Sequence, residues 1–149
     1  MNKNTSIRLA LPGDAINLSE MNREFNGCMR PIAAIAASLA VGGELVAIAL
    51  ADGSAAGFAC AQHSHSFCYE PGQGEVTELY VRPAFRRRGI AADLLAFLEK
   101  ELQKQGVNDI KILTGAENSN AIRVYERMGY RKKNETVLQK GLQHGAVDL

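Results

Sequence analysis

The clearest pattern of hydrophobic and polar positions in this chain lies between residues 75 and 106. Residues 75–81 alternate in side-chain character and are rich in β-branched and aromatic types, which predicts a β-strand. A turn is expected at Pro83. Apolar side chains then recur at helical spacing and charged ones fall opposite them, which predicts an amphipathic helix that ends at Gly106. The apolar positions are Leu94, Leu95, Leu98 and Leu102, and the charged ones are Glu99, Lys100, Glu101 and Lys104.

The N-terminal part of the chain carries shorter patterns of both kinds. Strands are predicted at residues 7–11, 44–51 and 55–62, and helices at residues 15–26 and 31–41. Asp14 is placed to cap the first helix, and Pro31 suits the first turn of the second. Asp52-Gly53 is a typical hairpin turn between two strands. These two helices therefore precede a β-hairpin.

The C-terminal part alternates between loops and short elements. Residues 63–74 are polar and contain Pro-Gly, which indicates a loop or an irregular strand end. Strands are predicted at residues 109–113, 130–132 and 135–139, and a helix at residues 121–128 after a capping segment at residues 118–120. The tail after Gly141 is expected to be loose. The predicted order is β-α-α-β-β-β-α-β-α-β-β in a single domain that spans residues 1–149.

Composition excludes several classes of protein. A net charge of +1 gives no general basic surface for nucleic acid. Apolar runs are short and the N-terminus lacks a secretory signal, so we expect a soluble, cytoplasmic protein without a membrane partner. The three cysteines, Cys28, Cys60 and Cys68, show no Cys-x-x-Cys pairing, which argues against disulfides and structural zinc. His63 and His65 lack a third ligand at suitable spacing, so no metal site is expected.

The order of strand, basic glycine loop and helix is typical of a phosphate-binding site. The first-turn amides of a helix have no partner inside it and attract anions. Arg86, Arg87 and Arg88 add positive charge, while Gly89 and Ala91 leave the backbone accessible. The loop lacks the Gly-Lys-Ser/Thr ending of a Walker A motif and two of the three glycines of a dinucleotide fingerprint. A solvated basic corner is the alternative interpretation.

Two motifs carry a family resemblance. The segment Arg86-Arg87-Arg88-Gly89-Ile90-Ala91 resembles the Arg/Gln-x-x-Gly-x-Gly/Ala signature of the GNAT superfamily of acyl-CoA-dependent N-acetyltransferases, and residues 78–81 resemble its preceding strand. Asn118, Ala121, Tyr125, Gly129 and Tyr130 follow with the spacing of the second coenzyme-binding motif of that superfamily. The resemblance spans residues 7–139.

The resemblance implies a GNAT-type α+β fold, in which a mixed, mainly antiparallel sheet of about seven strands is flanked by four helices. It implies acetyl-CoA as co-substrate, with no metal. The coenzyme-binding residues that it implies are Leu79, Tyr80, Val81, Arg86, Arg87, Arg88, Gly89, Ile90, Ala91, Asn118, Ala121 and Tyr125.

The resemblance also implies how transfer would occur. The strands at residues 75–81 and 109–113 would run parallel and splay apart, which frees the backbone groups of Leu79 and Val81. The Leu79 N–H would then stabilise the oxyanion. Glu78 would accept the proton of the amine, or else only attract a cationic substrate. Glu75 is the substitute base, on the other side of the strand if pairing is regular. Tyr125 matches the general acid of the family, although a core tyrosine is the alternative.

The acceptor is expected to be a primary amine of a small, cationic molecule such as an aminoglycoside or polyamine. Its site would be built from the first two helices, the link at residues 27–30, the loop at residues 67–72 and the last strands. Glu24 and Glu70 would add negative charge there to that of Glu78. A protein lysine or N-terminus is an alternative acceptor, and a non-catalytic acyl-CoA sensor is an alternative function. A homodimer is a further expectation, because dimers are common among proteins of this family.

Overall fold

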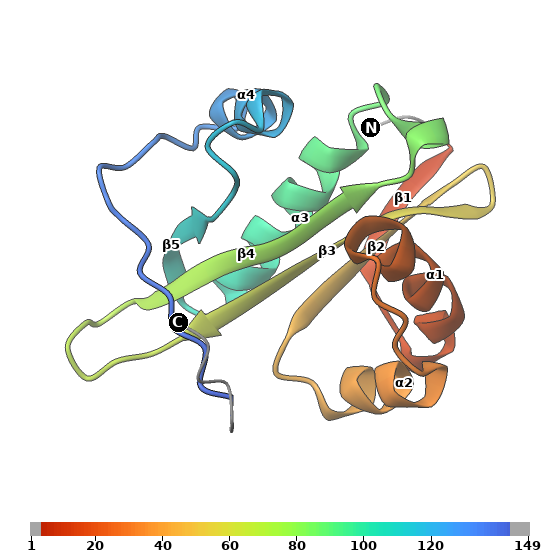
Figure 1. Cartoon of the computed structure of the whole chain (residues 1–149), viewed down its shortest axis with the longest axis horizontal. Helices are drawn as coiled ribbons and strands as arrows, with labels where there is room; N and C mark the ends of the chain where they lie inside the picture. The colour runs from red at the N-terminus through yellow and green to blue at the C-terminus, as the bar shows by residue number, and fades with distance from the viewer. Residues whose placement is uncertain (1–3, 144–149) are drawn as a thin grey trace.

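The computed structural model describes residues 4–143 as one mixed sheet with helices on both faces (Figure 1). The strands are β1 (Thr5–Leu9), β2 (Leu45–Ala51), β3 (Ser54–Ser64), β4 (Gly72–Val81) and β5 (Val107–Ile112). The helices are α1 (Ala15–Asn26), α2 (Ile32–Val41), α3 (Ile90–Lys104) and α4 (Ser119–Arg127). Two 3₁₀ turns, η1 (Pro12–Asp14) and η2 (Pro83–Phe85), precede α1 and α3. The expected α+β order is confirmed as far as α4.

The sheet has the strand order β1-β2-β3-β4-β5, antiparallel except for the parallel pair β4 and β5. Helix α3 covers one face and α1 and α2 cover the other (Figure 1). The face under α3 presents small side chains, because β2 and β3 place Ala47, Ala49, Ala59 and Ala61 there. Four leucines of α3 are 0% exposed against this face, and each contributes about 2 kcal/mol through burial.

An extra residue in β4 decides which face its carboxylates occupy. Cys60 lies opposite Glu78 and Ala61 lies opposite Val76, so Thr77 has no partner of its own. Val76 packs on the α3 face, whereas Tyr80 packs on the α1–α2 face. Glu75 and Glu78 therefore both lie on the α1–α2 face, and the regular alternation that would separate them is absent.

Strands β4 and β5 separate before β4 ends. Their pairing runs only from Gly72↔Val107 to Val76↔Ile112, so residues 77–81 extend beyond the end of β5. On its other edge β4 stays paired with β3 as far as Val81. One edge of the last half of β4 is consequently open.

The prediction of seven strands was wrong for the part of the chain that the structure describes, which has five. Residues 130–132 and 135–139 follow α4 without strand pairing and are largely exposed. Arg131, Lys132, Lys133 and Glu135 give this segment a charged composition with low β-propensity. The tail beyond residue 143 lies outside the described residues. Within residues 4–143, no helix has the length and apolar character that crossing a membrane requires.

Candidate active site

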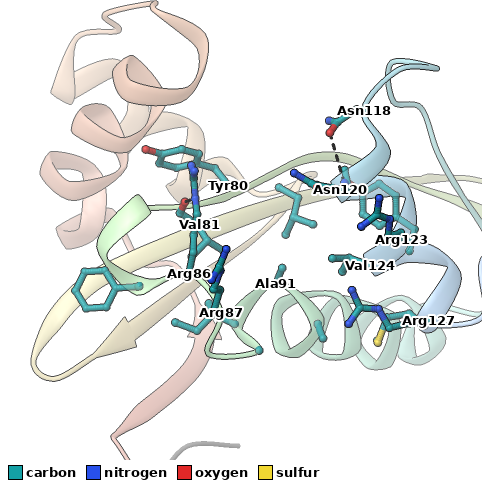
Figure 2. Close-up of a pocket in the computed structure, with 18 of the residues that line it drawn as sticks. Tyr80, Val81, Arg86, Arg87, Ala91, Asn118, Asn120, Arg123, Val124 and Arg127 are labelled. Atoms are coloured by element: carbon teal, nitrogen blue, oxygen red, sulfur yellow. Dashed lines mark hydrogen bonds between the residues drawn. The ribbon is translucent and has the colours of Figure 1, made fainter.

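A large groove lies where β4 leaves β5. Its volume is about 1080 Å³, and it is bounded by the end of β4, the loop before α3, the first turn of α3 and helix α4. Eleven of the twelve coenzyme-binding residues predicted from the sequence line it: Leu79, Tyr80, Val81, Arg86, Arg87, Gly89, Ile90, Ala91, Asn118, Ala121 and Tyr125. Residues more than 40 positions apart in the sequence thus face one space (Figure 2).

The loop before α3 has the backbone shape of an anion-binding site. Gly89 caps α3 with φ 77°, and no side chain caps the free amides of the first turn. Arg87 also has a positive φ, 65°, which costs a non-glycine residue roughly 1 kcal/mol or more. Left-handed residues beside a helix start turn consecutive N–H groups toward one point. The groove therefore ends in uncapped N–H donors.

The three consecutive arginines have different surroundings. Arg86 donates a hydrogen bond from Nε to the carbonyl oxygen of Val81 at 2.9 Å. Arg87 lines the groove beside it. Arg88 instead pairs with Asp52 in the β2–β3 turn, with Nη1 and Oδ2 2.9 Å apart, and is absent from the groove lining. Its guanidinium also lies 5.7 Å from the Phe85 ring centroid. The structure thus brings two of the three guanidinium groups to the groove.

Two further arginines, which sequence reasoning missed, line the groove from α4. Arg123 and Arg127 are four residues apart on one face of the helix, and Figure 2 shows them across the groove from Arg86 and Arg87. Among residues 4–143 neither one forms an ion pair with a carboxylate. Their i, i+4 spacing after the Asn118 cap is the sequence feature that indicates a shared face of α4. Four guanidinium groups therefore face this space.

The backbone of Leu79 points toward the open edge of β4. The N–H of Arg82 donates to the carbonyl of Ala56 at 2.8 Å, so these opposed residues form a hydrogen-bonded pair. Hydrogen-bonded and non-hydrogen-bonded pairs alternate along an antiparallel ladder. The pairs Gly57↔Val81 and Ala59↔Leu79 are then of the second kind, and their β4 members direct N–H and C=O away from β3. These groups point toward the open edge of β4, the orientation that the family resemblance implies, and the Val81 carbonyl there accepts from Arg86.

Tyr125 reaches the groove from α4. Burial raises the pKa of its phenol above the ordinary value, so it is protonated at neutral pH. Its ring meets that of Tyr130 edge-on with centroids 6.3 Å apart, and the Tyr130 hydroxyl donates to Glu99 Oε2 at 2.7 Å. Asn118 Oδ1 accepts from the N–H of Ala121 at 3.4 Å and so caps α4 (Figure 2).

Glu78 belongs to a second, smaller cavity on the α1–α2 face of the sheet. This cavity, hereafter the acidic cavity, has a volume of about 180 Å³. It is lined by Leu18, Asn22, Arg30, Ile35, Ser38, Leu39, Glu44, Val46, Phe58, Cys60 and Glu78. Because Leu79 lines the large groove, adjacent residues of β4 serve the two spaces.

Of the other acidic and aromatic candidates, Glu24 lines the large groove and the rest lie outside both cavities. Glu24 accepts hydrogen bonds from the Tyr80 hydroxyl at 2.9 Å and from Arg82 at 3.0 Å, and the Arg82 contacts are the main reason that its pKa is lowered. Glu70, Phe67 and Tyr69 are exposed and outside the lining of both cavities. The rings of His63 and His65 lie 5.4 Å apart, and the described residues contain no cluster of three metal-ligating side chains.

Comparisons with known proteins agree with this geometry. A sequence model of the Acetyltransferase (GNAT) family matches residues 17–130. An aminoglycoside acetyltransferase from an uncultured soil metagenomic sample, solved in complex with trehalose, superposes with a TM-score of 0.84 at 13% identity, over 95% of this chain and 99% of that chain. Aminoglycoside N-acetyltransferase AAC(6')-Iy in complex with CoA gives 0.79 at 22% identity, over 92% and 94%.

A third solved structure acts on a different kind of acceptor. Ribosomal-protein-alanine N-acetyltransferase from Brucella melitensis biovar Abortus 2308 superposes with a TM-score of 0.78 at 16% identity, over 92% of this chain and 99% of that chain. Identities this low establish a shared fold. The choice between a small-molecule and a protein acceptor therefore depends on the residues of the site.

Proposed function

Because this chain belongs to the Acetyltransferase (GNAT) family, we propose that it transfers the acetyl group of acetyl-CoA directly to a primary amine of a small, cationic molecule. The observation that carries the proposal is the groove in which the open edge of β4, an uncapped helix start and four guanidinium groups face one space. Such a space suits a long ligand with an anionic end and a thioester end.

Coenzyme binding would use the two ends of the groove differently. The N–H groups of Gly89, Ile90 and Ala91, with Arg86 and Arg87, would hold the diphosphate. Arg123 and Arg127 would supply additional positive charge from α4. Arg88 would contribute through its backbone, since its guanidinium is paired with Asp52. The Leu79 backbone and the Val81 N–H, which point away from β3, would bond to the pantetheine arm or the acetyl carbonyl beyond the end of β5.

Proton transfer would be shared between Glu78 and Tyr125. An alkylammonium is neutral in only about one part in a thousand at pH 7, and only the neutral amine attacks a thioester. Glu78 would accept the proton that the attacking nitrogen loses, directly or through one water, as the C–N bond forms. The Leu79 N–H would stabilise the oxyanion, a contribution of about 3 kcal/mol. As the C–S bond breaks, Tyr125 would give its proton to the departing thiolate and recover one from solvent.

The small-molecule acceptor is supported by the shape of the α1–α2 face. The space beside Glu78 is a cavity of about 180 Å³ rather than an extended groove, and an extended peptide needs a groove with exposed backbone partners. Two solved structures of similar fold are aminoglycoside acetyltransferases, although at identities below 25%.

Release of free thiol from acetyl-CoA tests the proposal. The purified chain is incubated with aminoglycosides, polyamines, amino acids and peptides that carry a lysine or a free N-terminus. Turnover that is highest on small polycationic amines is expected. Turnover confined to peptides would move the acceptor to the protein class. Tight CoA binding without turnover on any amine would make the protein an acyl-CoA sensor.

A further inference from the structure

The acidic cavity contains two carboxylates without a cationic partner. Glu20, Glu24, Asp14, Asp52, Glu75 and Glu101 each form an ion pair with a lysine or arginine. Within residues 4–143, Glu44 and Glu78 form none, although Arg30 lines the same space. Glu78 is partly buried and Glu44 is exposed, and a cation that joins them in this space would offset their mutual repulsion.

The sheet register places the two carboxylates around one thiol. Glu44 directly precedes β2, and Val46, two residues on, lies opposite Cys60 of β3. Cys60 lies in turn opposite Glu78 of β4. Cys60 is 8% exposed, and the pKa of its thiol is raised, first by burial and then by Glu44 and Glu78. The register of β2, β3 and β4 thus places Glu44 and Glu78 on either side of Cys60.

The two carboxylates also affect each other. The pKa of Glu44 is raised chiefly by burial of its carboxylate, and further by repulsion from Glu78, against a hydrogen bond with Gln62 that lowers it. An ammonium group between them would relieve this repulsion.

We propose that the acidic cavity binds a second ammonium group of the acceptor, and that Glu44 makes the enzyme select compact diamines over monoamines. This inference rests on the proposed function, because Glu78 and Leu79 must receive the nitrogen that is acetylated. The cavity volume equals that of about six water molecules, enough for one aminoalkyl arm or one edge of an amino sugar.

The charges of the cavity match a diamine in its reactive state. Two carboxylates and the guanidinium of Arg30 give the lining a net charge of −1. The attacking nitrogen must be neutral, while the second nitrogen of a diamine remains an ammonium. The reactive complex is then electrically neutral before Glu78 takes up a proton. A monoamine would leave Glu44 without a cationic partner.

The matched acceptors 1,4-diaminobutane and butylamine test this inference in steady-state acetylation and in calorimetric binding. The wild-type chain is expected to prefer the diamine in kcat/KM. Glu44→Gln should raise KM for the diamine about tenfold, the effect of one charge-assisted contact, and leave the butylamine constants and KM for acetyl-CoA unchanged. Glu117→Gln, at an exposed carboxylate outside both cavities, is the control.

Each outcome of this experiment separates the two proposals. Equal losses for both amines in Glu44→Gln, or a wild-type chain without preference, would overturn the diamine site while acetyl transfer stands. Diamine binding that disappears in Glu44→Gln, with no thiol release from acetyl-CoA, would support the site and overturn the transferase assignment. Absence of diamine binding to the wild-type chain would overturn the site.

Discussion

At the residue scale, Tyr125 is the side chain whose surroundings fit a general acid. Its phenol lines the groove, and burial keeps its pKa above the ordinary value. We expect Tyr125→Phe to lower kcat by about 100-fold, the usual effect of a general acid, because the thiolate then leaves without a proton. KM for acetyl-CoA and the melting temperature should change little. Steady-state kinetics and thermal unfolding check this, and wild-type turnover would remove the acid assignment.

Glu78 is the residue for which two roles make different kinetic predictions. As a base it acts only in the transition state, so Glu78→Gln should lower kcat by about 100-fold. As a mere attractor of cations it would act on ground-state binding, and the variant would raise KM for the acceptor at constant kcat. Kinetics in which the polyamine concentration is varied up to saturation distinguish these roles. A change confined to KM would contradict the base.

At the element scale, the start of α3 depends on a glycine with a positive φ. Gly89 and Gly106 have φ of 77° and 81°, and an added Cβ would meet nothing within 4 Å at either position. Gly89→Leu and Gly106→Leu should therefore each destabilise the fold by about 1–2 kcal/mol. Only Gly89 lines the groove, so only Gly89→Leu should weaken CoA binding, by about tenfold or more.

Calorimetric CoA binding and chemical unfolding of both glycine variants make this comparison. A CoA affinity of Gly89→Leu equal to that of the wild type would mean that the loop before α3 does not hold phosphate. Loss of affinity in both would point to a general effect of destabilisation.

The junction of β1 and η1 gives a prediction about pH. Arg8 donates to Asp14 at 2.7 and 2.9 Å, and the N–H of Leu11 donates to the same carboxylate at 2.7 Å. The Arg8 hydrogen bonds are the main cause that lowers the pKa of Asp14 below its ordinary value, against burial, which raises it. The stabilisation is therefore complete above about pH 4, the value in the unfolded chain, and is lost as pH falls through the lower folded pKa.

Asp14→Asn should accordingly lower the free energy of unfolding by about 2 kcal/mol at pH 7, with a smaller difference from the wild type below pH 4. Urea unfolding of both proteins between pH 2.5 and pH 7 measures this. A difference that stays constant over the whole range would show that the carboxylate charge contributes nothing to the junction.

At the scale of the whole molecule, local patterns predicted the elements, and long-range register decided the site. The leucine spacing of α3 and the glycine loop before it are local signals, and both were confirmed in position. The extra residue Thr77, which brings Glu75 and Glu78 to one face, depends on the pairing of β4 with β3. Glu44 joins the site only through the register of three strands. Such features leave no signal in one segment of sequence.

Long-range contacts also explain the remaining differences. Arg88 belongs to a run of three arginines, but Asp52, 36 positions earlier, draws its guanidinium away from the groove. Arg123 and Arg127 had a local signal in their helical spacing, which became meaningful once α4 was placed across the groove. The last two predicted strands needed a partner edge, and their charged sequence gives little preference for one.

Acetyl transfer as proposed requires that the arginines on both sides of the groove hold the phosphates of CoA. Isothermal titration calorimetry of CoA tests it most directly, with the wild-type chain, the double variant Arg87→Gln/Arg127→Gln, and Arg131→Gln as a control outside the groove. We expect one CoA per chain, an affinity at least about tenfold weaker in the double variant, and no change in the control. An unchanged affinity in the double variant would contradict this requirement.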